Sequence, residues 1–331
     1  MNDSLNKVLI IGLGSIGSRH LRLIKEFFPE KYCVLLRSGL GKENPEESLA
    51  DEVIYSPDEV KDEFSSVIIS TPSTFHLDNI SFLLSKKNLK NILVEKPISD
   101  NFSKANDLLY DIEKSNIKIL VGYVLRYLPE VKKIKQVLDE ELLGKILHVQ
   151  VDAGSYLPSW RPNQNYRSSV SANKNLGGGI LLELSHEIDY LKYFFGNFDH
   201  IFANTSNTGT LDIDVSDLAH LFIKTKSGVI CNATLDFCRL HTTRKCKIFG
   251  SEASLSWDIS KHSVEINYPG NKEFFDFGQS HNQMYIDQLE HFFSLDQDKT
   301  YPIVSFADGL ETLRVISSAE RSSKYKKIIY L

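Results

Sequence analysis

The sequence contains few cysteines and no long hydrophobic run. Its 331 residues include only Cys33, Cys231, Cys238 and Cys246, and no two of these form a C-x-x-C pair. This spacing favours neither a disulfide framework nor a zinc site, and it is typical of reduced thiols in a cytoplasmic protein. No apolar run approaches the ~18 residues that span a bilayer, so we expect no membrane segment.

The sequence also lacks an excess of positive charge. It has 38 Lys and Arg against 43 Asp and Glu, a net charge of −5, which argues against a nucleic-acid partner. Its charged fraction of 24% is that of an ordinary globular protein and excludes disordered or collagen-like classes. The apolar residues 8–17 could be mistaken for a signal peptide. Asp3 before them and the charged residues 19–26 after them argue against that interpretation.

The first third of the chain alternates buried strands with amphipathic helices. Strands are predicted at residues 7–12, 32–37, 67–70, 91–94 and 118–122, and helices at 15–28, 75–86 and 101–115. Strands joined by helical crossovers form a parallel sheet that is covered on both faces. We therefore predict a doubly wound α/β domain over residues 1–122.

The pattern changes after residue 122. One more helix is predicted at 129–142, and apolar residues then alternate strictly with polar ones at 147–153 and 229–237. Short strands are expected at 247–249, 254–257 and 263–267. Such strands form a largely antiparallel sheet with helices on one face, whose other face is solvated or covered by a partner. We therefore predict a second α/β domain over residues 123–331.

A glycine-rich turn follows the first predicted strand. Gly12, Gly14, Ser15, Ile16 and Gly17 belong to a G-x-G-x-x-G that ends a strand and opens a helix. The first glycine permits the tight turn, the second lets the backbone approach a pyrophosphate, and the third allows close packing of helix and strand. The backbone amides of the helix start then form an anion site. This context predicts a dinucleotide-binding turn.

The ribose-reading position lies at the end of the second predicted strand. An NAD-selective site carries Asp or Glu there, whereas this sequence has Arg37 and Ser38. Arg37 can bind a 2′-phosphate that a carboxylate would repel. We therefore expect NADP(H) to be favoured over NAD(H), with a surface arginine and dual cofactor use as the alternative.

Two groups suggest hydride-transfer chemistry. Glu95 and Lys96 end a later strand before Pro97, and ligands of open α/β sheets bind beyond the carboxyl ends of the strands. A solvated strand-end lysine is the alternative.

Glycines 177–179 open a helical stretch in which His186 lies between Glu183 and Asp189 on roughly one face. A histidine oriented in this way can exchange a proton near neutral pH, although it can also be a core residue. The run is not H-E-x-x-H, so we expect no metal.

Residues 154–176 form a long segment with little periodicity. Long loops of this kind are usually functional. The candidate substrate residues in it are Tyr156, Trp160, Arg161, Asn163, Asn165, Tyr166 and Arg167. Aromatic faces stack on sugars and arginines bind carboxylates or phosphates, and Arg126 adds a further cation. The loop therefore favours an anionic or nucleotide-activated sugar, although single aromatics can instead serve only to pack the loop.

The chain resembles the glucose–fructose oxidoreductase/inositol dehydrogenase (Gfo/Idh/MocA) family over nearly its whole length. The matching motifs are residues 12–17 with Arg19-His20, Thr71-Pro72 with His76, Glu95-Lys96-Pro97, Gly122-Tyr123 with Arg126-Tyr127, residues 177–179, His186 and Asp189. Two departures concern Ser73, where the family usually has Asn, and Glu183, which precedes His186 by three residues instead of four.

The resemblance implies a Rossmann domain followed by an α/β domain whose open sheet face mediates a homodimer or homotetramer. It implies that Lys96 and His186 are the catalytic pair, that Thr71, Pro72, His76 and Glu95 lie on the cofactor side, and that Tyr123 lies on the substrate side.

The expected activity is hydride transfer between a nicotinamide cofactor and a hydroxyl or keto carbon of a sugar. By analogy, such a sugar belongs to surface-polysaccharide biosynthesis. In this scheme Lys96 polarises the reacting oxygen and His186 exchanges the hydroxyl proton, with Asp189 or Glu183 orienting its ring. An imine or tetrapyrrole reductase and a non-catalytic dinucleotide sensor are the alternatives.

Overall fold

The computed structural model describes residues 6–39, 44–61, 64–278, 282–297 and 299–331. The chain divides into two units. The first comprises Met1–Val124 and Asn282–Leu310, and the second comprises Leu125–His281 and Glu311–Leu331. The sequence-based division at residue 122 did not include this return of residues 282–310 to the first unit.

The first unit contains a six-stranded sheet in the order β3-β2-β1-β4-β5-β6, and every pair of neighbours is parallel. The strands are β1 (Lys7–Ile11), β2 (Tyr32–Leu36), β3 (Glu52–Ile54), β4 (Ser66–Ile69), β5 (Asn91–Val94) and β6 (Lys118–Val121). At the end of β1, Ile11 pairs with Leu36 on one side and Ile69 on the other. The strand order therefore reverses between β1 and β4, the place where α/β sheets bind ligands.

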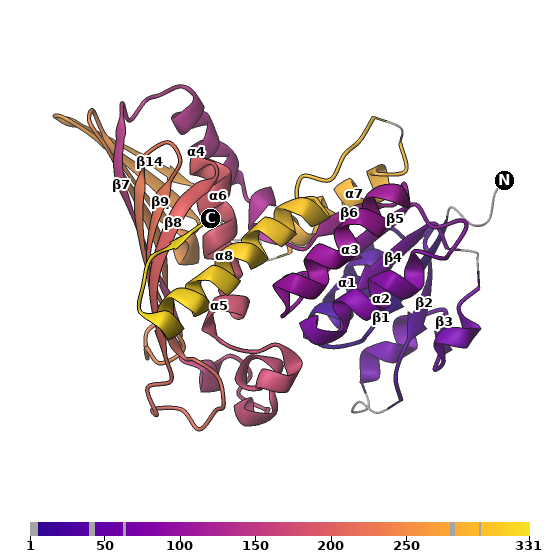
Figure 1. The fold of residues 1–331 in the computed structure, drawn as a ribbon. Helices are drawn as coiled ribbons and strands as arrows, with labels where there is room; N and C mark the ends of the chain where they lie inside the picture. The colour runs from indigo at the N-terminus through magenta and orange to yellow at the C-terminus, as the bar shows by residue number, and fades with distance from the viewer. Residues whose placement is uncertain (1–5, 40–43, 62–63, 279–281, 298) are drawn as a thin grey trace. The chain divides into compact units, whose positions relative to one another are not determined.

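Helices cover both faces of this sheet. They are α1 (Ser15–Phe27), α2 (His76–Leu83), α3 (Phe102–Lys114) and α7 (Gln283–Ser294), with short 3-10 helices η2 (Pro45–Leu49), η3 (Pro57–Glu59) and η4 (Ser73–Phe75). Ile24 of α1 and Phe292 of α7 share a buried cluster with Ile10, Leu35 and Ile68 of the strands. Right-handed crossovers in the opposite direction put α2 and α3 on the other face, where they contact each other (Figure 1).

Residues 282–310 complete the first unit. The backbone amide of Val121 donates to the carbonyl of Val304 at 2.9 Å, and Leu120 forms a bridge with Ser305. The fold class and the strands and helices predicted for the first third of the chain are confirmed.

The second unit contains a nine-stranded sheet in the order β14-β13-β12-β11-β7-β10-β9-β8-β15. Its strands are β7 (Ile146–Gly154), β8 (Phe198–Ser206), β9 (Leu218–Thr225), β10 (Ile230–Asp236), β11 (Thr243–Gly250), β12 (Ser254–Asp258), β13 (Ser263–Tyr268), β14 (Asn271–Asp276) and β15 (Ile329–Tyr330). Only β7 and β10 pair in parallel, so the predicted mostly antiparallel sheet is confirmed.

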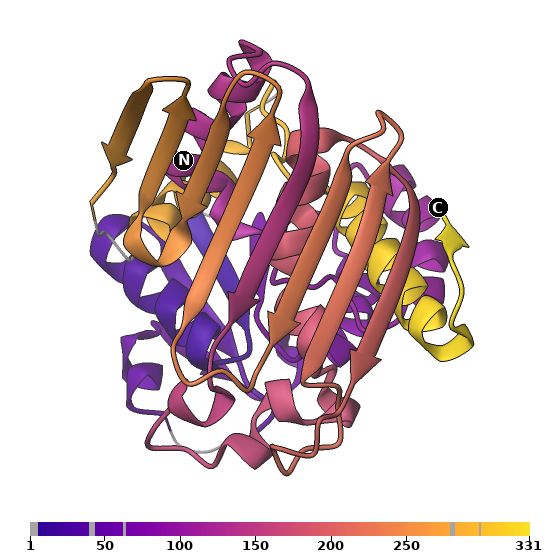
Figure 2. The same ribbon diagram turned by 90° about the vertical axis from the view of Figure 1, so that its left-hand side faces the viewer.

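One face of this sheet is buried. The helices of the unit are α4 (Pro129–Asp139), α5 (Ile180–Glu183), α6 (Ser185–Phe195) and, from Glu311 onward, α8 (Phe306–Tyr325). Val149 and Cys231 are fully buried beneath them, whereas the alternate residues Gln150, Asn232 and Lys247 are exposed. Figure 2 shows this outer face toward the viewer, with α6 and α8 behind the strands. The alternation thus separates a helix-covered face from an outer one.

None of the helices in the described part of the chain is long and apolar enough to cross a membrane.

Candidate functional site

The glycine turn has the shape that a dinucleotide requires. Gly12 adopts a φ of +94°, which L side chains rarely tolerate. A Cβ at Gly17 would lie 2.4 Å from the Gly12 carbonyl oxygen, whereas a Cβ at Gly14 would meet no atom within 4 Å. The space at Gly14 is therefore open to a ligand. Ser15 and Ile16 form the first turn of α1, which has no acidic residue and no side-chain cap, so its amides fit an anionic pyrophosphate.

Two residues that the sequence analysis missed hold this turn. Ser70, directly after β4, donates its hydroxyl to the carbonyl of Gly12 at 2.8 Å. The side-chain amide of Asn44 donates to the carbonyl of Leu13 at 3.1 Å and to the Ser18 hydroxyl at 2.8 Å. Asn44 also caps η2, and its position before Pro45 is a helix-start signal that the sequence offered.

The predicted ribose-reading residues follow β2. The Arg37 guanidinium forms an ion pair with Glu47 of η2, and the arginine side chain is only 11% exposed. Tyr55 donates its phenol hydroxyl to the other oxygen of Glu47 at 2.8 Å. The hydrogen bonds from Tyr55 and then Arg37 lower the pKa of Glu47. Ser38 is exposed beside this arrangement. A carboxylate therefore does lie at the end of β2, but it comes from another element.

His76 connects the segments that follow β4 and β5. Its Nε2 lies 2.8 Å from the carbonyl oxygen of Thr71 and its Nδ1 lies 2.9 Å from that of Pro97. The histidine is buried, and burial lowers its pKa. Asn79 donates to the Thr71 hydroxyl at 3.1 Å, so the turn at Thr71 and Pro72 is held from α2. The direct cofactor contacts predicted for Thr71, Pro72 and His76 stay predictions.

Glu95 is held by a buried histidine. Its Oε1 lies 2.7 Å from Nε2 of His20, which is fully buried in α1. A Cβ at Gly122 would lie 2.8 Å from Oε2 of the same carboxylate, so glycine makes room for it. The half-buried Lys96 follows directly and therefore extends from a firmly held strand end.

Two further residues of this unit that the sequence analysis singled out are buried. Ser73 lies where the resemblance leads us to expect asparagine, and its buried hydroxyl has no hydrogen-bond partner among the described residues. Tyr123, which the resemblance assigns to the substrate side, is fully buried.

In the second unit, the helix that carries His186 is interrupted. The sequence predicted one helical stretch that would place Glu183 and His186 on one face. In the structure α5 ends at Glu183 and α6 begins at Ser185, because Leu184 between them adopts φ −95° and ψ 33°. The prediction of one continuous helix through Glu183 and His186 is therefore wrong, and the orienting role predicted for Glu183 stays a prediction. His186 lies in the first turn of α6 and is 9% exposed.

Asp189 binds Arg126. The guanidinium donates to the carboxylate through Nε at 2.7 Å and through Nη2 at 2.9 Å. Both side chains are buried, and the guanidinium lies 4.0 Å from the ring centroid of Tyr193. Such a planar, two-point contact is a strong charged hydrogen bond. The predicted roles of Asp189 toward His186 and of Arg126 toward substrate stay predictions.

A second buried carboxylate on α6 went unnoticed in the sequence. Glu187 is fully buried and accepts hydrogen bonds from Arg244 of β11 at 2.7 and 3.2 Å. This pair fastens the His186-bearing helix to the sheet beneath it.

The loop after β7 is organised by four short 3-10 helices. These are η6 (Leu157–Ser159), η7 (Tyr166–Ser168), η8 (Val170–Ala172) and η9 (Lys174–Leu176). A hollow in it is lined by Leu157, Trp160, Arg161, Gln164, Asn165, Tyr166, Ser169 and Ser171. Four of the predicted substrate residues, Trp160, Arg161, Asn165 and Tyr166, therefore lie around one hollow.

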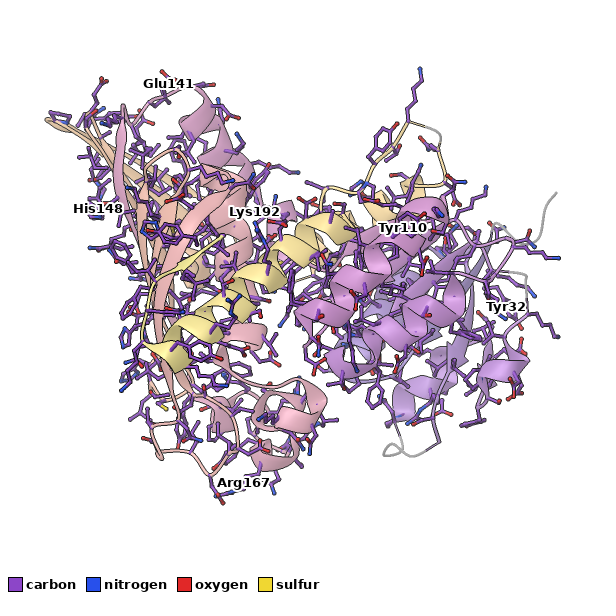
Figure 3. All side chains as sticks on the ribbon, viewed as in Figure 1. Tyr32, Tyr110, Glu141, His148, Arg167 and Lys192 are labelled. Atoms are coloured by element: carbon purple, nitrogen blue, oxygen red, sulfur yellow. The ribbon has the colours of Figure 1, made fainter. Side chains whose placement is uncertain are left out.

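Several aromatics and cations of the loop have protein partners. Trp160 donates to the Ser155 hydroxyl at 2.6 Å and contacts the ring of Phe237 edge-on at 5.4 Å between centroids. Arg167 pairs with Asp212 at 2.9 Å and lies over the ring of Tyr166, at the far end of the loop (Figure 3). The substrate contacts predicted for these side chains and for Tyr156 stay predictions.

Within the described residues, no group of three or more His, Cys, Asp or Glu side chains is arranged to hold a metal ion. The four cysteines are free thiols. Burial raises the pKa of Cys33 to about 11 and that of Cys231 to about 12.

Comparison with known families matches both units. Residues 6–123 match the family described as "Oxidoreductase family, NAD-binding Rossmann fold", and residues 131–256 match the "GFO/IDH/MocA C-terminal domain".

Individual relatives are distant. A myo-inositol 2-dehydrogenase of Thermotoga maritima is 21% identical over 98% of both chains. Oxidoreductase P35 of Formosa agariphila is 26% identical over 63% of this chain and 64% of its own length.

Solved structures share the fold over the whole length. A levoglucosan dehydrogenase in complex with NADH has a TM-score of 0.85 at 18% identity over 98% of both chains. A putative NADPH-dependent oxidoreductase from Desulfitobacterium hafniense has a TM-score of 0.82 at 16% identity, covering 98% of this chain and 97% of the other. The protein is therefore an oxidoreductase of the Gfo/Idh/MocA family with an NAD-binding Rossmann domain.

Proposed function

We propose that this oxidoreductase transfers a hydride between NADP(H) and a hydroxyl or keto carbon of an anionic or nucleotide-activated sugar. The observation that carries the proposal is the glycine turn, whose open space at Gly14 and uncapped helix start suit a dinucleotide pyrophosphate. Relatives that are named as dehydrogenases of inositol, and a structural neighbour named as a levoglucosan dehydrogenase, support a polyhydroxylated substrate.

The nicotinamide ring, when bound, supplies the acceptor or donor of the hydride. Lys96, as a cation at the end of β5, polarises the reacting oxygen of the sugar. His186 takes the hydroxyl proton on oxidation and returns it on reduction. The His20–Glu95 pair supports the strand end from which Lys96 extends, and the Glu187–Arg244 pair supports the helix that carries His186.

The residue types of the loop support the choice of sugar. Trp160 and Tyr166 offer aromatic faces for a sugar ring, and the exposed Arg161 offers a cation for a carboxylate or phosphate. By analogy with family members that carry a similar loop, we propose a sugar of surface-polysaccharide biosynthesis. This residue set favours an anionic sugar over the apolar, planar substrate of a tetrapyrrole reductase.

The preference for NADP(H) rests on Arg37. No acid follows β2 directly, and a guanidinium can bind a 2′-phosphate at two points. The same guanidinium forms an ion pair with Glu47.

The outer face of the nine-stranded sheet suits a second copy of the chain. Phe202, Phe222 and Phe274 project from it with 43%, 38% and 59% exposure. His148 stacks on Phe249 on the same face (Figure 3). Exposed apolar side chains grouped on one face are typical of an interface. We therefore propose a homodimer or homotetramer, in the cytoplasm, where the free thiols stay reduced.

The test is the change in nicotinamide absorbance with a panel of inositols, uronates, nucleotide sugars, cyclic imines and tetrapyrroles. The proposal expects turnover with at least one anionic sugar, and a drop of about a hundredfold or more in Lys96→Ala with dinucleotide affinity nearly unchanged. Turnover restricted to imines or tetrapyrroles would contradict the sugar assignment. Tight dinucleotide binding without any turnover would instead support a sensor.

A further inference from the structure

The ribose end of the dinucleotide site contains a carboxylate that comes from η2. Glu47 binds the Arg37 guanidinium through one oxygen and accepts a hydrogen bond from Tyr55 through the other. Its side chain is 24% exposed, and that of Arg37 is 11% exposed. Both carboxylate oxygens are therefore engaged at the position where a 2′-phosphate would compete for the same cation.

Contacts with the glycine turn help to fix the position of Glu47. Asn44 caps η2 by accepting from the backbone amide of Glu46 at 3.0 Å. The same side chain donates to the carbonyl of Leu13 in the glycine turn. Glu46 makes an exposed pair with Arg22 of α1 at 3.2 Å, in which the arginine side chain is 53% exposed. The helix η2 is thus attached through Asn44 to the turn that receives the pyrophosphate.

The position of Glu47 is also fixed from the sheet side. Tyr55 follows β3, which pairs with β2, and the backbone amide of Arg37 donates to the carbonyl of Ile54 at 3.0 Å. A Cβ at Gly39 would lie 3.7 Å from the Tyr55 ring, so this tyrosine also lies against Gly39. The Glu47 carboxylate is therefore held at the end of β2 by residues that follow two strands of the sheet.

We infer that Glu47 determines cofactor specificity, because its carboxylate occupies the Arg37 guanidinium and limits the preference for NADP(H) over NAD(H). A 2′-phosphate must share or displace this partner and meets its negative charge, whereas the 2′-hydroxyl of NAD(H) carries no charge to repel. The inference rests on the proposed function, in which Arg37 contacts the group at the 2′ position of the ribose. Arg37 attracts the 2′-phosphate and Glu47 repels it, so the two residues together determine the ratio of the affinities for NADP(H) and NAD(H).

The test compares Glu47→Gln with Glu46→Gln by calorimetric titration of NADPH and NADH into the full chain. Both variants remove one negative charge from η2, but only Glu47 contacts Arg37. We expect Glu47→Gln to bind NADPH about tenfold more tightly and NADH within about threefold of the wild type. We expect Glu46→Gln to leave the ratio of the two affinities within about twofold.

Equal shifts in the two variants would overturn the inference, because they would indicate a general effect of charge. An unchanged ratio in Glu47→Gln would overturn it as well. Failure of the wild type and of both variants to bind either dinucleotide would instead refute the proposed function.

Two further variants separate charge from position. Tyr55→Phe removes the hydrogen bond that holds Glu47 and leaves its charge, so we expect a smaller gain, about two- to threefold, in NADPH affinity. In an Arg37→Ala background, Glu47→Gln should change the affinity ratio less than about threefold, because the competition for the guanidinium is gone. A full tenfold effect in that background would contradict the role of Arg37 as the contested group.

Discussion

The Arg126–Asp189 ion pair makes a sharp prediction, because it assigns Asp189 a structural part that differs from the orienting role expected from the sequence. The change is Asp189→Asn, which keeps the size of the side chain and removes its charge. Both partners are buried, with 6% and 2% exposure, and the guanidinium donates two hydrogen bonds to the carboxylate. Removing one partner of such a pair leaves a buried charge without compensation.

The expected loss is about 3 kcal/mol of folding free energy. Breaking a buried pair typically costs ~3–5 kcal/mol, and the lower end applies because the amide still accepts one hydrogen bond and Tyr193 still lies over the guanidinium. For a domain of about 150–250 residues, each kcal/mol lowers Tm by roughly 2–4 °C, so Tm should fall by about 6–12 °C in thermal unfolding.

The matched control is Asp139→Asn. Asp139 pairs with Lys135 on the surface of α4, with 59% and 34% exposure, and exposed pairs contribute only about 0–1 kcal/mol. The double replacement Arg126→Met with Asp189→Leu should recover most of the loss, because it removes both buried charges.

The opposite result is equally clear. If Asp189→Asn keeps Tm within about 1 °C of the wild type while turnover collapses, the carboxylate acts on His186 and the structural account of the pair is refuted.

Three further predictions concern the dinucleotide unit and the thiols. Gly17→Ala should destabilise the protein by about 1–3 kcal/mol in urea unfolding, because its Cβ would lie 2.4 Å from a backbone oxygen. Gly14→Ala should unfold like the wild type but bind NADPH at least about tenfold more weakly. The reverse pattern would contradict the geometry of the turn. Burial lowers the pKa of His76 from 6.5, so near that pH the unfolded chain binds more protons than the folded one. The stabilising contribution of neutral His76 should therefore be present above about pH 6.5. It should decline as the pH falls through that value toward the pKa of the folded state. In thermal unfolding across pH, His76→Asn should flatten this slope, and an unchanged slope would exclude His76 as its source. Burial raises the pKa values of Cys33, Cys231 and Cys246. In native protein at pH 8, only the half-buried Cys238 should therefore react with a thiol reagent, and slowly. Rapid reaction of all four thiols would contradict the packing.

Local patterns predicted the first sheet and the glycine turn. The run at residues 7–12 is rich in β-branched residues, and the glycine spacing that follows requires a strand, a turn and a helix in succession. These features depend only on neighbours in the sequence, which explains why they could be predicted.

The parts that escaped prediction depend on contacts between distant segments. Helix α7 is amphipathic, but its sequence does not indicate that Phe292 packs against the first sheet. The carboxylate of Glu47 reaches Arg37 from a short 3-10 helix without periodicity. The break at Leu184 interrupts an apolar run that fits a continuous helix equally well. Strand β9, which the sequence analysis did not predict, nevertheless shows the alternation typical of a strand, since the buried Leu221 and Ile223 alternate with more exposed residues.

The central claim is that a dinucleotide places its pyrophosphate on the backbone amides at the start of α1. Hydrogen–deuterium exchange with and without NADPH tests it most directly, because it locates the protected amides. We predict protection of the peptide that covers residues 12–18, with further protection at Arg37 and Ser38. Unchanged exchange across residues 12–18 at saturating NADPH and NADH would contradict the claim.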